Sequence, residues 1–391
     1  MNHENNDRTY RNYLAEIGFS EAEVSARLDE WFDQMFTVGT PQCIYGEDSV
    51  GGYLIDTGND DVRTEGQSYG MMMAVQRNRQ DIFDKIWAWT KRYMWHSEGQ
   101  YVGYFAWSCD LDGTHRAEGP APDGEEYFAM ALFFASHRWG DREAPFDYSV
   151  QARDILHHCV HQKELTGGEG DPMWDPNNYQ IRFVPEAEWT DPSYHLPHFY
   201  DLFALWANEE DRPFWKKAAE ASRRLIPMSA HPVTGLAPEY SEYDGSPKVS
   251  PWGMGSSFYS DAYRVMLNIA LDTVWNGGCE AYETMATNEQ NFFAGIGFDN
   301  TKFMDYRLDG SVNKVRPFRQ PDAEPMERPA LHPVGLGATI AAASICSHSQ
   351  SREAWMRLFW NTPLRVDKRR YFDSDLCYFA LLMLSGQYRV W

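Results

Sequence analysis

Carboxylate side chains gather at three places in the sequence. They lie within residues 56–65, within residues 123–126, and at Asp261. Two carboxyl groups held on opposite sides of a bond can act as a general acid and a general base. Asp261 falls close to the apolar face of a predicted helix, where an unpaired charge is costly. It is therefore either functional or held by a salt bridge to Arg264 or by capping its helix.

Glu65 stands at the point where a polar loop runs into a long apolar segment. Residues 58–61 (Gly-Asn-Asp-Asp) are typical of a turn, and Thr64 with Gln67 has the spacing of a capping box. Apolar side chains then recur at intervals of three, four or seven as far as Tyr93, which predicts a helix over residues 65–93. Glu65 is well placed for chemistry, although it could instead only complement the dipole of this helix.

About a dozen predicted helices make up the chain, joined by turns and by longer loops rich in Gly, Pro, Asp and aromatic residues. Long helices without βαβ alternation predict an all-α fold with short β pieces in the loops, such as residues 101–108. No shift in composition marks a linker, so we expect a single domain over residues 1–391. Besides the helix of Glu65, the predicted helices lie near residues 21–32, 126–139, 149–160, 191–206, 212–227, 258–275, 282–293, 335–346, 352–360 and 375–384.

Helix pairs closed into a double ring would gather the long loops, and with them the site, at one end of the molecule. The same periodicity also fits an open helical solenoid, because exact repeats are absent. The sequence therefore leaves the closure of the ring open.

The net charge of −22 argues against nucleic acid or an anionic membrane as a partner, because both repel an acidic surface. A neutral substrate such as a sugar remains compatible with it. The chain holds 15 Trp and 22 Tyr, more than packing usually requires, and such rings often stack on sugars. The oligomeric state does not follow from the sequence.

The first residues carry neither a basic start nor an apolar core of a secretory signal, and no apolar run reaches membrane-spanning length. We therefore expect a cytoplasmic protein. The six cysteines form no Cys-x-x-Cys pair, which argues against a zinc or redox motif.

Metal and cofactor motifs are weak or absent. His157, His158 and His161 resemble a metal cluster, but no carboxylate stands at the usual spacing, so a structural role is favoured. The glycines match no phosphate-binding loop. We expect neither a metal nor a cofactor. Three carboxylate clusters with many aromatic residues and no such motif favour glycoside hydrolysis, which needs an acid and a base or nucleophile.

The sequence resembles glycoside hydrolase family 8 over nearly its whole length. The activities of that family include cellulase, lichenase, chitosanase and endo-xylanase. Leu331-His332-Pro333-Val334-Gly335 makes the chain most similar to the reducing-end xylose-releasing exo-oligoxylanases of the family. The other segments that carry the resemblance are residues 60–71 (DDVRTEGQSYGM), 121–128 (APDGEEYF), 193–197 (SYHLP) and 259–264 (YSDAYR).

The resemblance implies an (α/α)6 barrel and an inverting mechanism. It implies that Glu65 is the general acid and Asp261 the general base, and that Asp123 helps to hold and distort the sugar at the cleavage point. Inversion needs the two carboxyl groups roughly 6.5–9.5 Å apart. Residues as distant in sequence as Glu65 and Asp261 can meet that condition only if the helices close into a ring.

Five further residues are implied to contact the substrate. Tyr194 would help to place the attacking water, and Trp107 would stack on a sugar. Arg264 and Tyr371 would lie near the catalytic water and the sugar. His332 would contact the reducing-end hydroxyl, in a loop that closes the cleft just past the first sugar on the leaving side. The implied partner is a short β-1,4-xylo-oligosaccharide.

Two other functions remain as alternatives. One is an endo-acting xylanase or β-glucanase of the same fold, and the other is a non-catalytic oligosaccharide-binding protein. One tension also needs resolution, because a helix N-terminus lowers the pKa of a nearby carboxyl, whereas a general acid must hold its proton. Burial of Glu65, or the like charge of Asp123, must outweigh the helix dipole.

Overall fold

Six helices lie side by side and form a closed ring. The computed structural model describes residues 9–316 and 322–391, so the stretch used above to judge a secretory signal lies outside the described residues. Each helix of the ring contacts the next, and the last returns to the first. These inner helices are α3 (Thr64–Gln76), α5 (Pro122–Trp139), α7 (Pro197–Trp206), α9 (Arg264–Asn276), α11 (Pro333–Ala342) and α13 (Arg370–Leu384).

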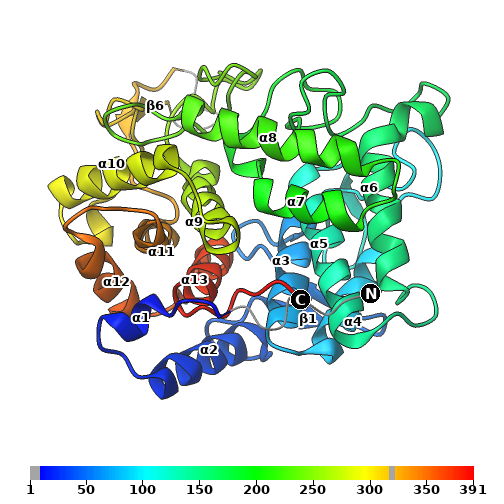
Figure 1. Cartoon of the computed structure of the whole chain (residues 1–391), viewed down its shortest axis with the longest axis horizontal. Coiled ribbons are helices and arrows are strands. Elements are labelled where there is room, and N and C mark those ends of the chain that lie inside the picture. The colour runs from blue at the N-terminus through cyan, green and yellow to red at the C-terminus, as the bar shows by residue number, and fades with distance from the viewer. Residues whose placement is uncertain (1–8, 317–321) are drawn as a thin grey trace.

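A second set of helices packs outside this ring, so the predicted all-α double ring is confirmed and the open solenoid is not. In Figure 1 the blue helix α2 lies beside the red α13, which joins the two ends of the chain. The outer helices are α2 (Glu21–Phe36), α4 (Gln80–Tyr93), α6 (Tyr148–Leu165), α8 (Arg212–Ser229), α10 (Glu280–Ile296) and α12 (Arg352–Asn361), and a short α1 (Tyr13–Glu16) precedes them.

The two rings differ in how their helices are buried. Every residue of α13 after Arg370 is buried, which is the pattern of a helix surrounded by protein on all sides. Helix α4 instead buries Ile82, Phe83, Ile86 and Trp87 on one face and exposes the other. The apolar content of each helix therefore places it in the inner or the outer ring.

The predicted helix over residues 65–93 is wrong, because two antiparallel helices occupy that stretch. Helix α3 ends at Gln76 and α4 begins at Gln80. Asn78 takes a φ of 59° in the turn, a left-handed conformation that Asn tolerates better than most residues. The apolar spacing runs on across the turn, since α3 and α4 bury facing sides against each other.

The predicted capping box at Thr64 is also absent. Arg63 is the N-cap residue, and it makes no side-chain cap. Gln67 turns inward, where it accepts from the Leu54 backbone N–H at 2.7 Å and donates to Thr90 Oγ1 at 3.0 Å. The same motif does form at Ser20, where side chain and backbone cap reciprocally with Glu23.

The helix predicted over residues 258–275 begins later than expected. Its first residues form the 3-10 helix η2 (Ser260–Tyr263), and α9 starts only at Arg264. Phe258 instead pairs with Tyr306 in an isolated bridge. Helix α13 differs in the other direction, because it begins at Arg370 rather than at residue 375, which puts Tyr371 in its first turn.

Short strands occupy the loops, as expected for this fold class. The three-stranded sheet β3-β4-β5 consists of β3 (Val62–Arg63), β4 (Ser108–Cys109) and β5 (His115–Ala117). The predicted strand over residues 101–108 is mostly turn, and only Ser108 enters β4. The remaining elements are β1 (Tyr45–Glu47), β2 (Gly52–Leu54), β6 (Lys314–Val315), β7 (Met326–Glu327) and the 3-10 helices η1 (Pro192–Tyr194), η3 (Asn300–Lys302) and η4 (Ala343–Ile345).

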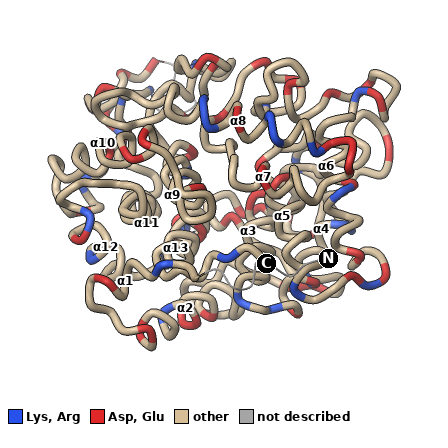
Figure 2. Tube along the Cα trace, in the orientation of Figure 1, with Lys and Arg blue, Asp and Glu red and all other residues tan. Residues whose placement is uncertain are grey.

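Acidic positions outnumber basic ones along the trace (Figure 2), in keeping with 57 Asp and Glu against 35 Lys and Arg. Within residues 9–316 and 322–391, no helix combines the length and the apolar character that crossing a bilayer requires.

Candidate active site

Glu65 lies in the first turn of α3, directly after strand β3. The Thr64 backbone N–H donates to the carbonyl of Trp107 at 3.0 Å, and Arg63 pairs with Ser108 across the β3-β4 sheet. The Arg63 guanidinium also lies 5.3 Å from the centre of the Trp107 ring. Backbone bonding therefore fixes Glu65 and Trp107 relative to each other.

Asp123 lies in the first turn of α5, after Pro122, whose ring suits the start of a helix. Helices α3 and α5 approach closely here, because a Cβ on Gly124 would stand 2.5 Å from Thr64 Cβ. Only glycine permits this contact, which brings the first turns of the two helices side by side. Glu65 and Asp123 thus face the same space.

Arg264, the first residue of α9, joins the carboxylates. Its Nη1 donates to Glu65 Oε2 at 2.8 Å and to Asp123 Oδ2 at 3.2 Å. Its Nη2 lies 3.6 Å from Asp191 Oδ2 and 3.7 Å from Asp261 Oδ1. The side chain of Arg264 is only 4% exposed. One buried guanidinium therefore faces four carboxyl groups.

Asp261 is the most open of these four carboxylates. Its side chain is 31% exposed, against 15% for Glu65. Ser260, just before it, has a φ of 24°, an unfavourable backbone conformation of the kind that clusters at functional sites. The structure thus corrects the expectation that Asp261 lies on a continuous helix close to its apolar face, because the 3-10 turn directs it toward the cleft.

The separation of Glu65 and Asp261 is bounded by the guanidinium between them. Their oxygens lie 2.8 Å from Nη1 and 3.7 Å from Nη2. The two Nη atoms of a planar guanidinium are about 2.3 Å apart, so the two carboxylate oxygens are less than about 9 Å apart. That bound is compatible with the roughly 6.5–9.5 Å that an inverting pair needs.

Tyr371 and Tyr194 both contact this cluster. The hydroxyl of Tyr371 donates to Glu65 Oε1 at 2.8 Å, and a Cβ on Gly66 would stand 2.7 Å from that hydroxyl. Glycine at position 66 is therefore what lets α13 approach the acid. Tyr194 lies beneath Arg264, whose guanidinium carbon is 5.4 Å from the ring centre.

A cleft with a volume of about 380 Å³ opens over these residues. Six of the eight predicted site residues line it: Glu65, Trp107, Asp123, Tyr194, Asp261 and Arg264. Tyr371 does not line the cleft and contacts the site through its hydrogen bond to Glu65. Phe183 and Trp252 also line the cleft, and the only sequence signal for them was the excess of aromatic residues.

His332 does not line the cleft. It is 7% exposed, and its Nδ1 faces Asp373 Oδ2 at 3.0 Å. The same carboxylate accepts from Gly335 N at 2.6 Å and from Arg365 Nη1 at 2.7 Å. The His332 ring packs edge-on against Phe372, which in turn contacts Arg264. His332 is held rigidly on the start of α11.

The electrostatics favour a proton on Glu65. Burial raises the pKa of Glu65 to about 7, and the charges of Asp123 and Asp261 act in the same direction, while Arg264 opposes them. Burial likewise raises the pKa of Asp123 to about 6. Burial is thus the main cause that outweighs the helix dipole, with Asp123 contributing. A proton donor at Glu65 facing an accessible carboxylate at Asp261 can perform general acid–base catalysis.

Asp191 is a site residue that the sequence reasoning missed. It was considered only as part of a helix start, and it does cap η1 by accepting from Ser193 N at 2.7 Å. Its other oxygen faces Arg264, and the residue is fully buried. Burial raises the pKa of Asp191 well above its usual range. In the sequence, an aspartate before Pro-Ser-Tyr is typical of a helix cap. Nothing there distinguished that role from a contact with Arg264.

Two of the three clustered histidines have a carboxylate partner in the structure. The sequence showed no supporting carboxylate for His157 and His161, but Asp211 at the start of α8 reaches both, at 2.9 Å and 2.6 Å. His158 points elsewhere and contacts Gln162. The missing carboxylate was far away in sequence and close in space.

The family model of glycosyl hydrolases family 8 matches residues 45–310. The chain belongs to this family. It is 54% identical over 389 residues to a reducing end xylose-releasing exo-oligoxylanase of Halalkalibacterium halodurans, covering 98% of this chain and 95% of the relative. This confirms the resemblance described above, and the protein is a glycoside hydrolase.

Solved structures agree with this assignment. The structure of Rex8A from Paenibacillus barcinonensis complexed with xylose is 51% identical, with a TM-score of 0.91 over 98% of this chain and 97% of that one. A mutant reducing-end-xylose releasing exo-oligoxylanase complexed with xylobiose is 53% identical, with a TM-score of 0.92 over 99% and 98% of the two chains. The predicted (α/α)6 barrel is confirmed.

Asp123→Asn should move the basic limb of the pH–rate profile to lower pH by about one unit. The substitution removes a negative charge that holds the proton on Glu65, and it leaves Arg264 freer to stabilise the ionised form. Rates on a xylo-oligosaccharide between pH 4 and 9 give the limb, whatever the absolute loss of activity. Asp123→Glu keeps the charge and should leave the limb in place. A limb that stays or moves upward in Asp123→Asn would contradict this role.

Arg264→Met should lower the free energy of unfolding by about 3–5 kcal/mol at pH 8, because it leaves buried carboxylates without their cation. The loss should shrink at pH 5. Carboxyls with raised pKa values bind more protons in the folded than in the unfolded state, so stability falls as pH rises. Urea unfolding at both pH values measures this. Arg11→Met, at an exposed ion pair with Glu16, should change stability by less than about 1 kcal/mol. Equal losses at the two pH values for Arg264→Met would be inconsistent with the charge argument.

Proposed function

We propose that this glycoside hydrolase removes xylose from the reducing end of short β-1,4-xylo-oligosaccharides, with inversion at the anomeric carbon. The observation that carries the proposal is the cluster in which Arg264 joins a largely buried Glu65, whose pKa is raised, to an accessible Asp261 within one cleft. The relatives named above, which cover nearly the whole chain at about half identity, bear names with this activity.

The reaction would proceed in one displacement. Glu65 donates its proton to the glycosidic oxygen as the bond from that oxygen to the anomeric carbon breaks. A water lying near Asp261 loses a proton to that carboxylate, and its oxygen bonds to the opposite face of the same carbon. The products are two sugars with one new hydroxyl each. Proton exchange with solvent then returns Glu65 and Asp261 to their starting states.

The remaining residues would position substrate and water. Asp123 can accept hydrogen bonds from the sugar at the cleavage point, and Tyr194 can direct the water. Trp107 offers a flat face for a neighbouring sugar, and such aromatic faces favour apolar sugar surfaces. Tyr371 and Arg264 hold the two oxygens of Glu65 and so fix the direction of its proton.

Removal of only one sugar at a time would come from the loop at His332. Arg365 donates to the Leu331 carbonyl at 3.0 Å, and Asp373 holds both His332 and the Gly335 N–H. These bonds support a rigid wall on the leaving side. A wall just past the first sugar would exclude longer leaving groups, and His332 would contact its anomeric hydroxyl.

We also infer that the enzyme works in the cytoplasm as one domain. All six cysteines are free thiols, the state that a reducing compartment maintains. The main hydrophobic core draws on residues from Tyr13 to Val390, which supports a single folding unit.

Xylotriose with a label in its reducing-end sugar should yield labelled xylose and unlabelled xylobiose. The new reducing end of xylobiose should appear first as the α-anomer, because inversion changes the configuration at a β-linkage. Proton NMR during the first minutes records both. Labelled xylobiose with unlabelled xylose would mean that the leaving side is open, as in an endo-acting enzyme.

Glu65→Gln is the control that separates an enzyme from a binding protein. It should lower turnover by about 100- to 10,000-fold while leaving oligosaccharide affinity nearly unchanged, since only the proton donor is lost. Isothermal titration with xylotriose gives that affinity. Unchanged turnover would remove Glu65 from the mechanism.

His332→Ala should admit longer leaving groups or weaken the preference for the reducing end, because it removes the contact with Asp373 that supports the proposed wall. Product analysis on reducing-end-labelled xylopentaose would then show labelled xylobiose beside labelled xylose. Val334→Ala, two residues along at the start of the same helix, should leave the products unchanged. Identical products from His332→Ala and the unaltered enzyme would exclude this loop as the source of exo action.

A further inference from the structure

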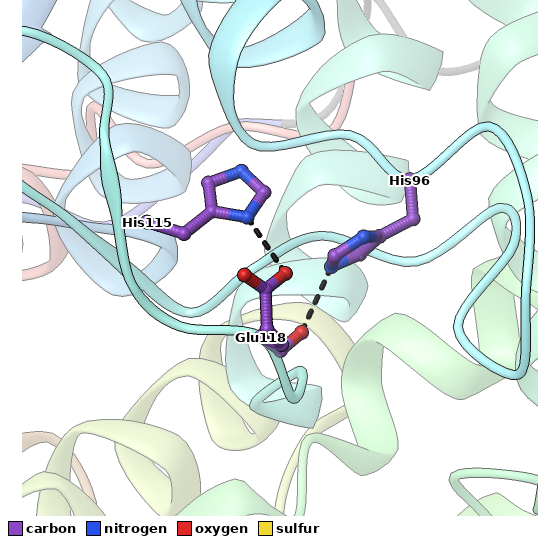
Figure 3. Close-up of side chains that lie close together, drawn as sticks. All are labelled: His96, His115 and Glu118. Atoms are coloured by element: carbon purple, nitrogen blue, oxygen red, sulfur yellow. Dashed lines mark hydrogen bonds and ion pairs between the residues drawn. The ribbon is translucent and has the colours of Figure 1, made fainter.

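Three side chains outside the cleft converge on one point (Figure 3). His96 follows helix α4, His115 lies in strand β5, and Glu118 comes directly after that strand. The His115 Nδ1 faces Glu118 Oε2 at 2.8 Å, and the His96 Nε2 faces the Glu118 backbone carbonyl at 2.8 Å. Their potential ligand atoms all lie within 4.8 Å of one another.

Hydrogen bonds fix the orientation of the His115 ring in this cluster. Its Nε2 lies 2.6 Å from the Tyr93 carbonyl, which can only accept, so this nitrogen carries a hydrogen. The other nitrogen, Nδ1, faces the Glu118 carboxylate at hydrogen-bond distance. A metal ion can take the place of the proton that joins this nitrogen to the carboxylate.

We propose that His96, His115 and Glu118 bind a divalent transition-metal ion, with zinc as the best match. Two imidazoles and one carboxylate are ligands that zinc commonly takes, with water in a fourth position. The bond from His115 Nε2–H to a backbone carbonyl is the outer-shell contact that typically orients a metal-binding histidine. Binding through His96 Nε2 replaces the hydrogen bond of that nitrogen to the Glu118 carbonyl.

The ligands can reach metal distances with little movement. Zinc lies about 2.0–2.2 Å from nitrogen and oxygen ligands, so a pair of ligands must stand slightly further apart than the 2.8 Å seen for His115 and Glu118. The Glu118 side chain is 67% exposed and can move outward freely. The two histidines are held by the backbone on either side of it.

The site would brace one wall of the catalytic cleft. Strand β5 pairs with β4, whose sheet continues into β3 and the start of α3. The Gly119 carbonyl, next to Glu118, accepts from Trp107 N at 3.0 Å, and the following Pro120 and Ala121 line the cleft. An ion held here ties the loop after α4 to the segment that supports Trp107.

The cluster of His157, His161 and Asp211 is the natural comparison. There each histidine donates to a different oxygen of one carboxylate, at 2.9 Å and 2.6 Å. Asp211 is only 2% exposed, so it cannot move aside easily. The exposed Glu118 carboxylate can instead move to accommodate an ion, which favours the His96 cluster as the metal site.

Equilibrium dialysis of the full chain, carrying no polyhistidine tag, against zinc chloride tests the proposal. We expect one zinc ion per chain, with a rise in unfolding temperature of about a few degrees in excess zinc. Glu118→Gln keeps the shape of an exposed side chain and should weaken zinc binding at least tenfold. His115→Ala should abolish it. The double variant His157→Asn with His161→Asn should bind zinc as the unaltered chain does.

Two results would overturn the proposal. One is the absence of saturable zinc binding by the unaltered chain. The other is zinc binding that survives Glu118→Gln and His115→Ala but disappears in the His157 and His161 double variant, which would place the ion at the other cluster. Zinc K-edge absorption on the loaded chain should show two imidazoles, and a shell of oxygen alone would count against this site. None of these readouts depends on the proposed xylose-releasing activity.

Discussion

A single guanidinium that faces four carboxyl groups sets the chemistry of this molecule. Arg264 is buried and contacts Glu65, Asp123, Asp191 and Asp261. If all four were ionised, the cluster would carry three uncompensated negative charges in a region with little water, which is costly. The cluster therefore retains protons that an exposed set would lose. The cost of burying charge is what makes a carboxylic acid available near neutral pH.

Closure of the helical ring is what brings these groups together. Glu65 and Arg264 lie 199 positions apart in sequence, yet they share a hydrogen bond of 2.8 Å. Glu65 and Asp123 lie in the first turns of the inner helices α3 and α5, and Arg264 is the first residue of α9. Helix starts expose N–H groups that favour negative charge, so the barrel places its carboxylates where the backbone tolerates them. The close contacts at Gly66 and Gly124 then set the spacing of the helices.

Periodicity was sufficient to predict that the chain is built of helices, because each helix buries a stripe or its whole surface. It failed where something other than side-chain burial determines the backbone conformation. The chain turns at Asn78 although the apolar pattern continues across the turn. The late start of α9 reflects the bridge at Phe258. The candidate residues followed from family motifs, whereas Asp191, Phe183 and Trp252 depend on which loops meet across the ring. The spacing of residues along the chain does not indicate which loops meet across the ring.

The difference between the proposed acid and the proposed base arises from the backbone that carries each of them. Glu65 extends from a regular helix into the cleft, where Tyr371 and Arg264 hold both of its oxygens and burial keeps its pKa near 7. Asp261 lies in a 3-10 turn that begins with the unfavourable Ser260, and about a third of its side chain reaches solvent. Had α9 begun at residue 258 as a regular helix, Asp261 would share the burial of its neighbours. The strained turn is therefore what leaves one carboxylate of the cluster open to water.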